Sequence, residues 1–256
     1  MSLAALDADL LLVPALTGLL VAATHVPLGR EVLARGIIFV DLAVAQVAAL
    51  GVTAAYALGA EPQGWAVQAA AGGSALTGAL LLQGMERRWP AVQEALIGTT
   101  FVLAATAALL ILAGHPHGAE HIQELLAGQL LWTRPQQLPP VALLSVLVLA
   151  LWFGARRWRR GLFYTLFALS VTASVQLVGL YLVFATLIIP ALAVRRLKGI
   201  AGLGAGYGLA AAGYLVGIGA SALLDLPAGP AVVWALALLA VGMAGVRGLG
   251  MQRRGA

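Results

Sequence analysis

Long apolar blocks alternate with short polar hinges along this chain, and its basic residues keep a strict order among those hinges. Every Lys and Arg except Arg134 falls at every second hinge. The basic hinges hold Arg30 and Arg35; Arg87 and Arg88; Arg156, Arg157, Arg159 and Arg160; Arg195, Arg196 and Lys198; and Arg247, Arg253 and Arg254. Positive charge gathers on the cytoplasmic loops of proteins that cross a membrane several times. The order therefore predicts a multi-pass protein of the cell (inner) membrane, with its N-terminus outside and its C-terminus in the cytoplasm.

The composition also favours a membrane-embedded chain over a soluble domain. Hydrophobic residues make up 61% of the 256 residues and charged residues 10%, whereas soluble domains carry about 25% charged residues. The net charge of +5 is interpreted as a topology signal, because the basic residues lie at block ends and are not interleaved with aromatic residues. We therefore expect a lipid membrane as partner and no nucleic acid. The absence of cysteine excludes disulfides and thiolate metal sites.

A membrane-spanning helix needs about 20 apolar residues, and the sequence contains a series of such blocks. They cover residues 10–28, 36–58, 65–85, 95–114, 141–155, 161–194, 199–223 and 230–247. The block 161–194 has basic clusters at both ends, so it crosses the membrane twice or not at all, and Gln176 and Gly179 mark its break. We predict an all-α, polytopic helical bundle of about 8–9 spans, with one helix broken or re-entrant around 176–190.

The chain contains no Gly-rich loop ending in Lys-Ser/Thr, the motif that binds nucleotide phosphates. ATP hydrolysis is therefore expected only on a partner chain, and we predict that this protein is not itself an enzyme. A single transmembrane domain over residues 1–256 accounts for the sequence.

Asp41 is the only acidic residue inside a predicted span. A charge there is costly and normally faces a partner or a water-filled cavity, which favours a role in a pathway. If the helix begins near Gly36, Asp41 is instead a residue of the helix end. Gln46 and Gln176 also lie in apolar surroundings, where they either line a pathway or hydrogen-bond between helices. His25 is interpreted as a capping or interfacial residue.

Three of the four histidines lie in one polar stretch together with two glutamates. The stretch contains His115, His117, Glu120, His121 and Glu124. Imidazole and carboxylate groups suit Zn²⁺ or Mn²⁺, and a helix beginning near residue 118 would put His121 and Glu124 on one face. The alternative is an amphipathic surface helix whose polar face is hydrated. The spacing does not decide between the two.

Three stretches, read in order, resemble one family of membrane proteins. They are residues 27–41 (PLGREVLARGIIFVD), running on to Gln46 and Gly51; residues 94–98 (EALIG) with 125–132 (LLAGQLLW); and residues 174–193 (SVQLVGLYLVFATLIIPALA). They are similar to the permease subunits of ABC-type zinc/manganese uptake systems, the ABC-3 family. The third stretch is the most specific, because it resembles the family's Val-Gly-x-x-Leu-Val-x-Ala-Leu-Leu-Ile-x-Pro-Ala signature.

The resemblance implies a transmembrane permease domain that works as a homodimer and imports a divalent metal, zinc or manganese. It implies a cytoplasmic ABC ATPase and an extracytoplasmic metal-binding protein as partners, and no covalently bound cofactor. The residues expected along the translocation pathway are Asp41, Gln46, Gln176, Gly179 and Pro190. Arg156, Arg157, Arg159 and Arg160 are expected to contact lipid headgroups or the ATPase.

Two features differ from the family pattern. The family helix carries an Asp and a His four positions apart, whereas here Ala45 follows Asp41 at that spacing and Gln46 comes one position later. At ~100° per residue, Gln46 lies well off the face of Asp41. The Asp-x-x-x-Ala-x-x-x-Gly segment with which family members dock onto the ATPase is not recognisable near Arg160. A stand-alone secondary transporter or channel and a non-transport membrane scaffold are therefore the alternatives.

Overall fold

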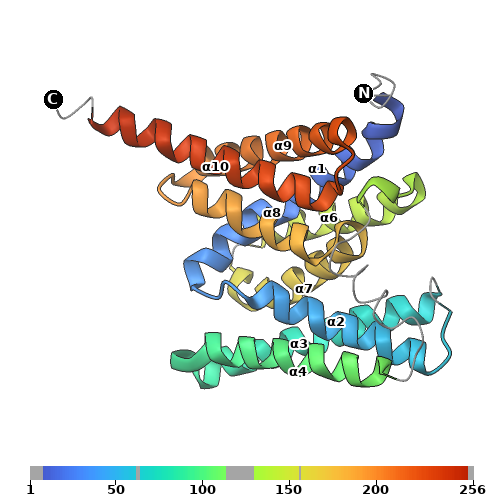
Figure 1. Cartoon of the computed structure of the whole chain (residues 1–256). Helices are drawn as coiled ribbons and strands as arrows, with labels where there is room; N and C mark the ends of the chain where they lie inside the picture. Colours follow the sequence, from blue (N-terminus) through green and yellow to red (C-terminus); the bar gives the residue numbers. More distant parts are fainter. Residues whose placement is uncertain (1–7, 62–63, 114–129, 156, 253–256) are drawn as a thin grey trace.

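The computed structural model describes residues 8–61, 64–113, 130–155 and 157–252, and side chains between residues 11 and 244 within those ranges (Figure 1). In these residues the chain forms α-helices and short 3-10 turns, and no strand. The helices are α1 (Ala8–Arg35), α2 (Val40–Ala57), α3 (Trp65–Arg88), α4 (Gln93–Leu112), α6 (Leu138–Gly154), α7 (Arg159–Val178), α8 (Leu180–Ala193), α9 (Gly199–Leu224) and α10 (Ala228–Gln252). The 3-10 turns are η2 (Pro90–Val92), η3 (Leu130–Trp132) and η4 (Pro135–Gln137).

Most of these helices can cross a membrane. Within the described residues, 7 are long and apolar enough by length and composition, and α8 and α10 add two shorter apolar stretches. The short block predicted at 141–155 becomes a full span because α6 begins at Leu138 and holds Pro139 and Pro140 in its first turn. Proline fits there, since the N–H that it lacks would have had no partner in the helix. The predicted all-α membrane bundle is confirmed.

The first helix is longer than its apolar block predicts. The block ends at residue 28, but α1 continues to Arg35 with Pro27 inside it. The turn that follows is residues 36–39, opening at Gly36 with φ +72°. Residues such as Leu, Glu, Ala and Arg favour helix, while glycine readily adopts the left-handed backbone that ends one. The basic segment expected to be a turn is therefore the last two turns of α1.

The predicted break in block 161–194 is confirmed at Gly179. This residue caps α7 and precedes α8, with φ 80° and ψ 164°. Its N–H donates to the Val175 carbonyl and its own carbonyl accepts from Val183 N–H. Gly179 is buried, as irregular backbone at membrane depth has to be. The 14 residues of α8 extend about 21 Å at 1.5 Å per residue, which is shorter than a full hydrocarbon core.

Helix α7 lies at the centre of the bundle. It packs against α2 and α3 on one side and against α1, α6 and α8 on the other, so it joins a layer of α2, α3 and α4 to a second group formed by α1, α6, α8, α9 and α10 (Figure 1). In its spanning window 61% of residues are buried, against 17% for α4 and for the span that contains α6. Most residues of α4 and of the span that contains α6 are therefore not buried by the rest of this chain.

Small residues allow close helix packing on one face of α9, as they commonly do between membrane-spanning helices. A side chain at Gly217 would overlap the backbone of Val232 in α10. The same holds for α1 and α8, because a side chain at Gly29 would overlap the Leu187 carbonyl. By contrast, Gly72 and Gly73 of α3 have open space around them. Close packing therefore explains only part of the abundant glycine.

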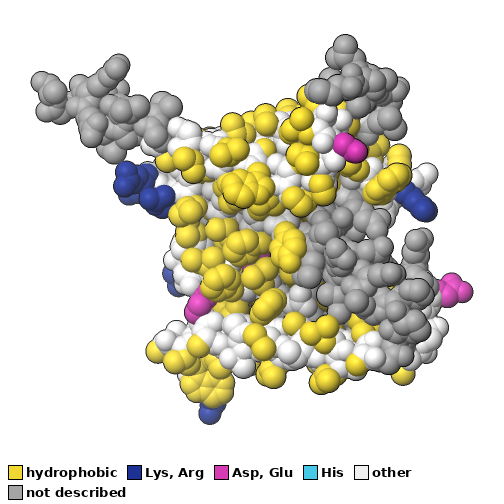
Figure 2. Space-filling view, viewed as in Figure 1, with side chains coloured by type: hydrophobic (Ala, Val, Ile, Leu, Met, Phe, Trp, Pro, Cys, Tyr) yellow, Lys and Arg dark blue, Asp and Glu magenta, His cyan; other side chains and the backbone are white. Residues whose placement is uncertain are grey.

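The basic clusters gather at one end of the bundle. Figure 2 shows the visible Lys and Arg side chains mostly at the left edge, with hydrophobic side chains across the middle. The ion pairs agree with this view, because Arg35 at the end of α1 pairs with Glu86 near the end of α3, and Arg159 at the start of α7 pairs with Glu31. We call this the basic end, and the other the opposite end. The charge order predicts that the basic end faces the cytoplasm.

Candidate functional site

A pocket of about 740 Å³ lies between the two helix groups. The wall from the first group consists of one face of α2, at Leu42, Gln46, Ala49 and Thr53, together with residues of α4. These four α2 residues recur at helical spacing, so they share one face. The pocket follows α2 from its first turn toward its last turn, as a path across a membrane would.

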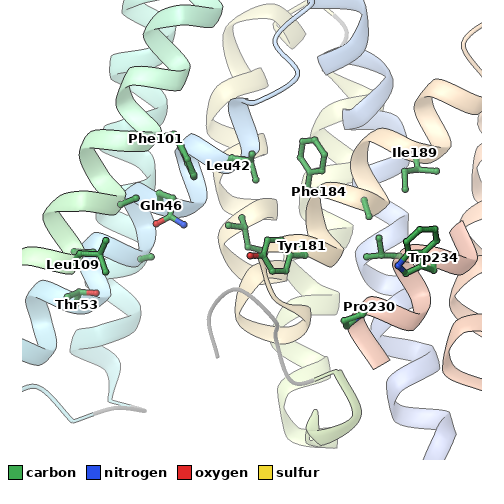
Figure 3. Close-up of a pocket in the computed structure, with 16 residues that line it drawn as sticks. Leu42, Gln46, Thr53, Phe101, Leu109, Tyr181, Phe184, Ile189, Pro230 and Trp234 are labelled. Carbon is green, nitrogen blue, oxygen red and sulfur yellow. The ribbon is translucent and has the colours of Figure 1, made fainter. Parts of the chain in front are cut away.

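The facing wall is formed by α8 and α10. Tyr181, Phe184 and Ile189 of α8 and Pro230 and Trp234 of α10 face the α2 and α4 side chains across the pocket (Figure 3). Phe184 also stacks on Phe39, at the start of α2, with ring centroids 6.3 Å apart. The break at Gly179 and the short α8 thus place one aromatic face of α8 against this space.

The pocket wall is almost entirely apolar. Gln46 and Thr53 are its polar residues on α2, and Tyr181 and Trp234 add a hydroxyl and an indole N–H opposite them. Among the described residues that line it, none is charged and none is a histidine. Among the described residues, no three His, Asp or Glu side chains gather closely enough to hold a metal ion. Any ion in this space would meet oxygen atoms from neutral groups first.

Asp41 lies next to this wall in the first turn of α2 and is 0% exposed. Within the described part of the chain, neither of its carboxylate oxygens has a hydrogen-bond partner. Its place in the first turn agrees with the alternative prediction of a helix-end residue. Its complete burial does not agree with a residue at the surface. A buried, unpaired carboxylate is costly, and the favourable partial charge of a helix N-terminus offsets only part of that cost.

The remaining pathway candidates do not all reach the pocket. Gln176 is exposed near the end of α7 and does not line it. Gly179 forms the cap before α8, and Pro190 is buried one residue beyond the lining residue Ile189. In the structure Gln46 therefore lines the pocket and Gln176 does not. Gly179 precedes α8, and Pro190 lies within it.

His25 differs from its predicted capping or interfacial role. It lies well inside α1 and is 0% exposed. Its Nδ1 is 2.8 Å from the Val21 carbonyl oxygen and 3.1 Å from Thr24 Oγ1. That prediction was wrong because α1 runs ten residues past His25, which removes this histidine from the helix end.

An ion-pair network links helices at the basic end, and it was not predicted from the sequence. Glu31 accepts hydrogen bonds from Arg35 Nε at 3.0 Å and from Arg159 at 3.0 Å, while Arg35 also reaches Glu86 at 3.4 Å. Arg35 lies over the Phe163 ring at 4.2 Å, and Arg159 over the Trp152 ring at 4.1 Å. The Glu31–Arg35 spacing of four residues was a signal for part of it.

The other basic residues near α7 differ from Arg159. Arg157 and Arg160 are exposed, so they can meet headgroups or a partner, whereas Arg159 is engaged with Glu31. Arg156 lies outside the described residues. So do His115, His117, Glu120, His121 and Glu124, and the predicted metal cluster stays a prediction.

The aromatic pocket wall was also not predicted from the sequence. Tyr181 and Phe184 are three residues apart, and Tyr181, Ala185 and Ile189 recur four residues apart, inside the 174–193 stretch. That spacing was the available signal. It could not show that α10 supplies Trp234 to the same wall, because that depends on tertiary packing.

Comparisons with known proteins agree with this architecture. The family described as "ABC 3 transport family" matches residues 7–159 and 157–246. The structure of PsaBC from Streptococcus pneumoniae in complex with Fab is similar with a TM-score of 0.73 at 16% identity, covering 91% of this chain and 90% of that chain. A second structure, of an inward-facing conformation of a protein assigned as a metal-chelate type ABC transporter, gives 0.62 at 21% identity, covering 94% and 85%. No curated protein sequence matches the chain.

Proposed function

The chain belongs to the ABC-3 transport family, and from that membership we propose that it is the membrane-spanning permease subunit of an ABC-type importer for a divalent metal ion. Zinc and manganese are the proposed cargo. The observation that carries the proposal is the family match over nearly all of a bundle that contains a broken helix beside a pocket. Broken helices of this kind recur at the substrate sites of transporters.

Asp41 is the charged residue we propose for the ion's path. Its buried carboxylate has no hydrogen-bond partner in the described residues, and carboxylates within membrane-spanning segments commonly mark ion pathways. The next residue, Leu42, lines the pocket, so a rotation of the first turn of α2 by up to about 100°, the angle between adjacent helical residues, would bring the carboxylate toward that space. Gln46 would then supply a weaker oxygen ligand one turn further along.

The pocket between α2 and α8 is the part of the path in which we place alternating access. One side rests on the α2, α3 and α4 layer, and the other on α8 and α10. Relative motion of these two groups about α7 would open the pocket toward one membrane face and then the other. Such a motion needs an energy source, and we propose a separate cytoplasmic ATPase.

The remaining partners follow from the same proposal. An extracytoplasmic protein would deliver the ion, and two copies of the chain would form the transporter. The stretch with His115, His117, Glu120, His121 and Glu124 is proposed as the first ligand set that the ion meets. Replacing His115, His117 and His121 by Ala should weaken Zn²⁺ binding to the purified protein at least tenfold in calorimetric titrations. Unchanged titrations would exclude this site without affecting the proposed pathway.

Uptake of radiolabelled zinc or manganese into reconstituted vesicles tests the function. The protein is combined with a candidate ATPase, with and without ATP, and accumulation should require both. Asp41→Asn, which keeps the side-chain shape, should lower the rate at least tenfold, while Gln176→Leu, at an exposed position outside the pocket, should change it less than twofold. Uptake that is indifferent to ATP would overturn the proposal.

A stand-alone secondary transporter is the second candidate, and one specific observation favours it. Only residues 155–158 connect α6 to α7 at the basic end, and the docking segment described for the resemblance is not recognisable there. In the same vesicles, this candidate predicts metal uptake that follows an imposed proton or sodium gradient and does not change when ATPase and ATP are added.

A further inference from the structure

A second pocket, of about 510 Å³, opens at the basic end between α1, α6, α7 and α9. Its basic residues are Arg30 and Arg159, and its apolar side is formed by Phe153 of α6 and Ile200 and Leu203 of α9. It is separate from the pathway pocket, with which it shares no lining residue. The proposed transport function does not use it.

Arg30 is fixed in this pocket by backbone carbonyls. Its guanidinium donates to the Gly199 carbonyl at 3.1 Å and to the Leu197 carbonyl at 3.2 Å. Among the described residues, no carboxylate forms an ion pair with it. A guanidinium has five N–H donors, so donors are left over. The Arg30 guanidinium fits here because residue 202 is glycine. A Cβ atom at that residue would lie 2.9 Å from Arg30 Nη2.

Glu31, which also borders the pocket, does not supply a free negative charge. One of its carboxylate oxygens accepts from Arg35 and the other from Arg159. Arg159 is half-exposed, with 39% of its side chain accessible, and its guanidinium lies over Trp152. This cluster contains three arginines, Arg30, Arg35 and Arg159, and two glutamates, Glu31 and Glu86, so one positive charge is in excess. The guanidinium groups of Arg30 and Arg159 both border the pocket.

The apolar side of the pocket is exposed, as expected for a surface in contact with a membrane. Ile200, in the first turn of α9, is 88% exposed and Phe153, at the end of α6, is 42% exposed. Trp158, in the short α6–α7 connection, is 71% exposed. Tryptophan is enriched at the boundary between hydrocarbon and headgroups. The pocket thus has guanidinium groups at the headgroup level and apolar side chains beside them.

We propose that this pocket binds an anionic phospholipid, with Arg30 and Arg159 contacting the headgroup phosphate and the acyl chain lying along Ile200, Leu203 and Phe153. Guanidinium groups bind phosphate with paired, charge-assisted hydrogen bonds. Basic pockets between transmembrane helices on the cytoplasmic side are suited to such headgroups. The charge complementarity and the adjacent apolar wall select a lipid over a soluble anion, which would leave that wall exposed.

Native mass spectrometry of the detergent-solubilised full chain tests the proposal, with phosphatidylglycerol, phosphatidylcholine and inorganic phosphate as separate probes. Phosphatidylglycerol should bind in a one-to-one complex that phosphatidylcholine does not match. Arg30→Gln should weaken this complex about fivefold, the effect of one Lys or Arg near an anionic headgroup. Arg196→Gln is the matched control, since Arg196 is exposed at the same end but does not line the pocket.

Ile200→Glu keeps the test decisive if Arg30→Gln does not fold, because this exposed position tolerates change and places a negative charge at the pocket edge. It should weaken phosphatidylglycerol binding at least fivefold. Equal binding of the two lipids would overturn the proposal, and so would an equal loss in Arg196→Gln. Competition by millimolar inorganic phosphate as effective as that by the lipid would show a soluble-anion site and overturn the assignment to a lipid.

Discussion

The two ends of the bundle are held together by different kinds of interaction. At the basic end, Arg35 links α1 to α3 and contacts an aromatic ring of α7, and Glu31 links α1 to α7. At the opposite end, the described contacts are local, such as the hydrogen bond from Ser221 Oγ to the Leu226 carbonyl at 2.6 Å. No ion pair between described residues lies there. The basic residues that predict the topology thus also link helices to one another, and within the described part of the chain they do so at one end only.

This difference has a consequence for motion. Ion pairs with rings beside them resist separation of the helices that they join, because separating them leaves charges unpaired. Local turn contacts move together with the helices that carry them. If the two helix groups move relative to each other, we expect the opposite end to open with less resistance than the basic end, where the network has to break first.

Arg35→Ala should break the comparison with the largest effect. The substitution leaves Glu31 and Glu86 without this partner and removes the contact with Phe163. Together these losses should lower the free energy of unfolding in detergent by about 2 kcal/mol. Thermal unfolding of the purified protein measures it. Arg196→Ala, at an exposed position of the same end, should change the stability by less than about 0.5 kcal/mol. Equal effects of the two variants would contradict a specific network.

Glu31→Gln should have the next largest effect. The amide keeps the shape of the side chain but removes the charge that both Arg35 and Arg159 contact, and the expected loss is about 1 to 2 kcal/mol. A double-mutant cycle with Arg159→Gln should give a combined effect smaller than the sum of the two single effects. Strict additivity would show that the two residues do not interact in the membrane protein.

Ser221→Ala should have a smaller effect at the opposite end. The variant loses the hydroxyl that donates to the Leu226 carbonyl, while the backbone bond from Leu226 N–H to the Ser221 carbonyl stays. We expect a loss of about 1 kcal/mol, measured by the same unfolding assay. Thr106→Ala removes an exposed hydroxyl bonded within its own helix and should be close to neutral.

Asp225→Gly should have the smallest effect and the opposite sign. Asp225 ends α9 in the left-handed region, with φ 53° and ψ 47°, where glycine is not strained. The gain is partly offset by the greater entropy of glycine in the unfolded chain, so we expect stabilisation of at most about 0.5 kcal/mol. Asp225→Ala should destabilise instead. If glycine were the worse substitution, the side chain of Asp225 would hold a contact that the backbone conformation does not reveal.

The fold was predictable in outline because its main signals are local. Block lengths and the order of basic residues indicated an all-α membrane bundle, and Gly179 marked the break between α7 and α8. The prediction was wrong where the helix continues beyond the apolar block, because polar residues with high helix propensity follow it. Residues 29–35 are polar enough to end an apolar block, yet they remain helical to Arg35. The turn before α2 therefore begins at Gly36, and His25 lies ten residues from the end of α1.

The candidate site was less predictable because its parts come from distant segments. Asp41 and Gln46 stood out as polar residues in apolar surroundings, but the sequence did not show that the Gln46 face of α2 meets α8 and α10. Likewise, Glu31 could be matched to Arg35 four residues away, but not to Arg159 at a separation of 128 residues. Pairing over such a distance depends on how the helices pack.

Sequence alone determined that this chain is a membrane bundle, which end carries the positive charge and where one helix breaks, because these properties depend on the solvation of each segment by itself. Only the tertiary structure decided which side of each helix meets which neighbour. That choice gave the apolar pocket its two walls and, among the described residues, left the buried Asp41 carboxylate without a hydrogen-bond partner and the Arg30 guanidinium without an ion-pair partner. In a bundle whose helices are apolar on nearly every face, hydrophobicity cannot select the contacting side, and close packing of small and large residues selects it instead.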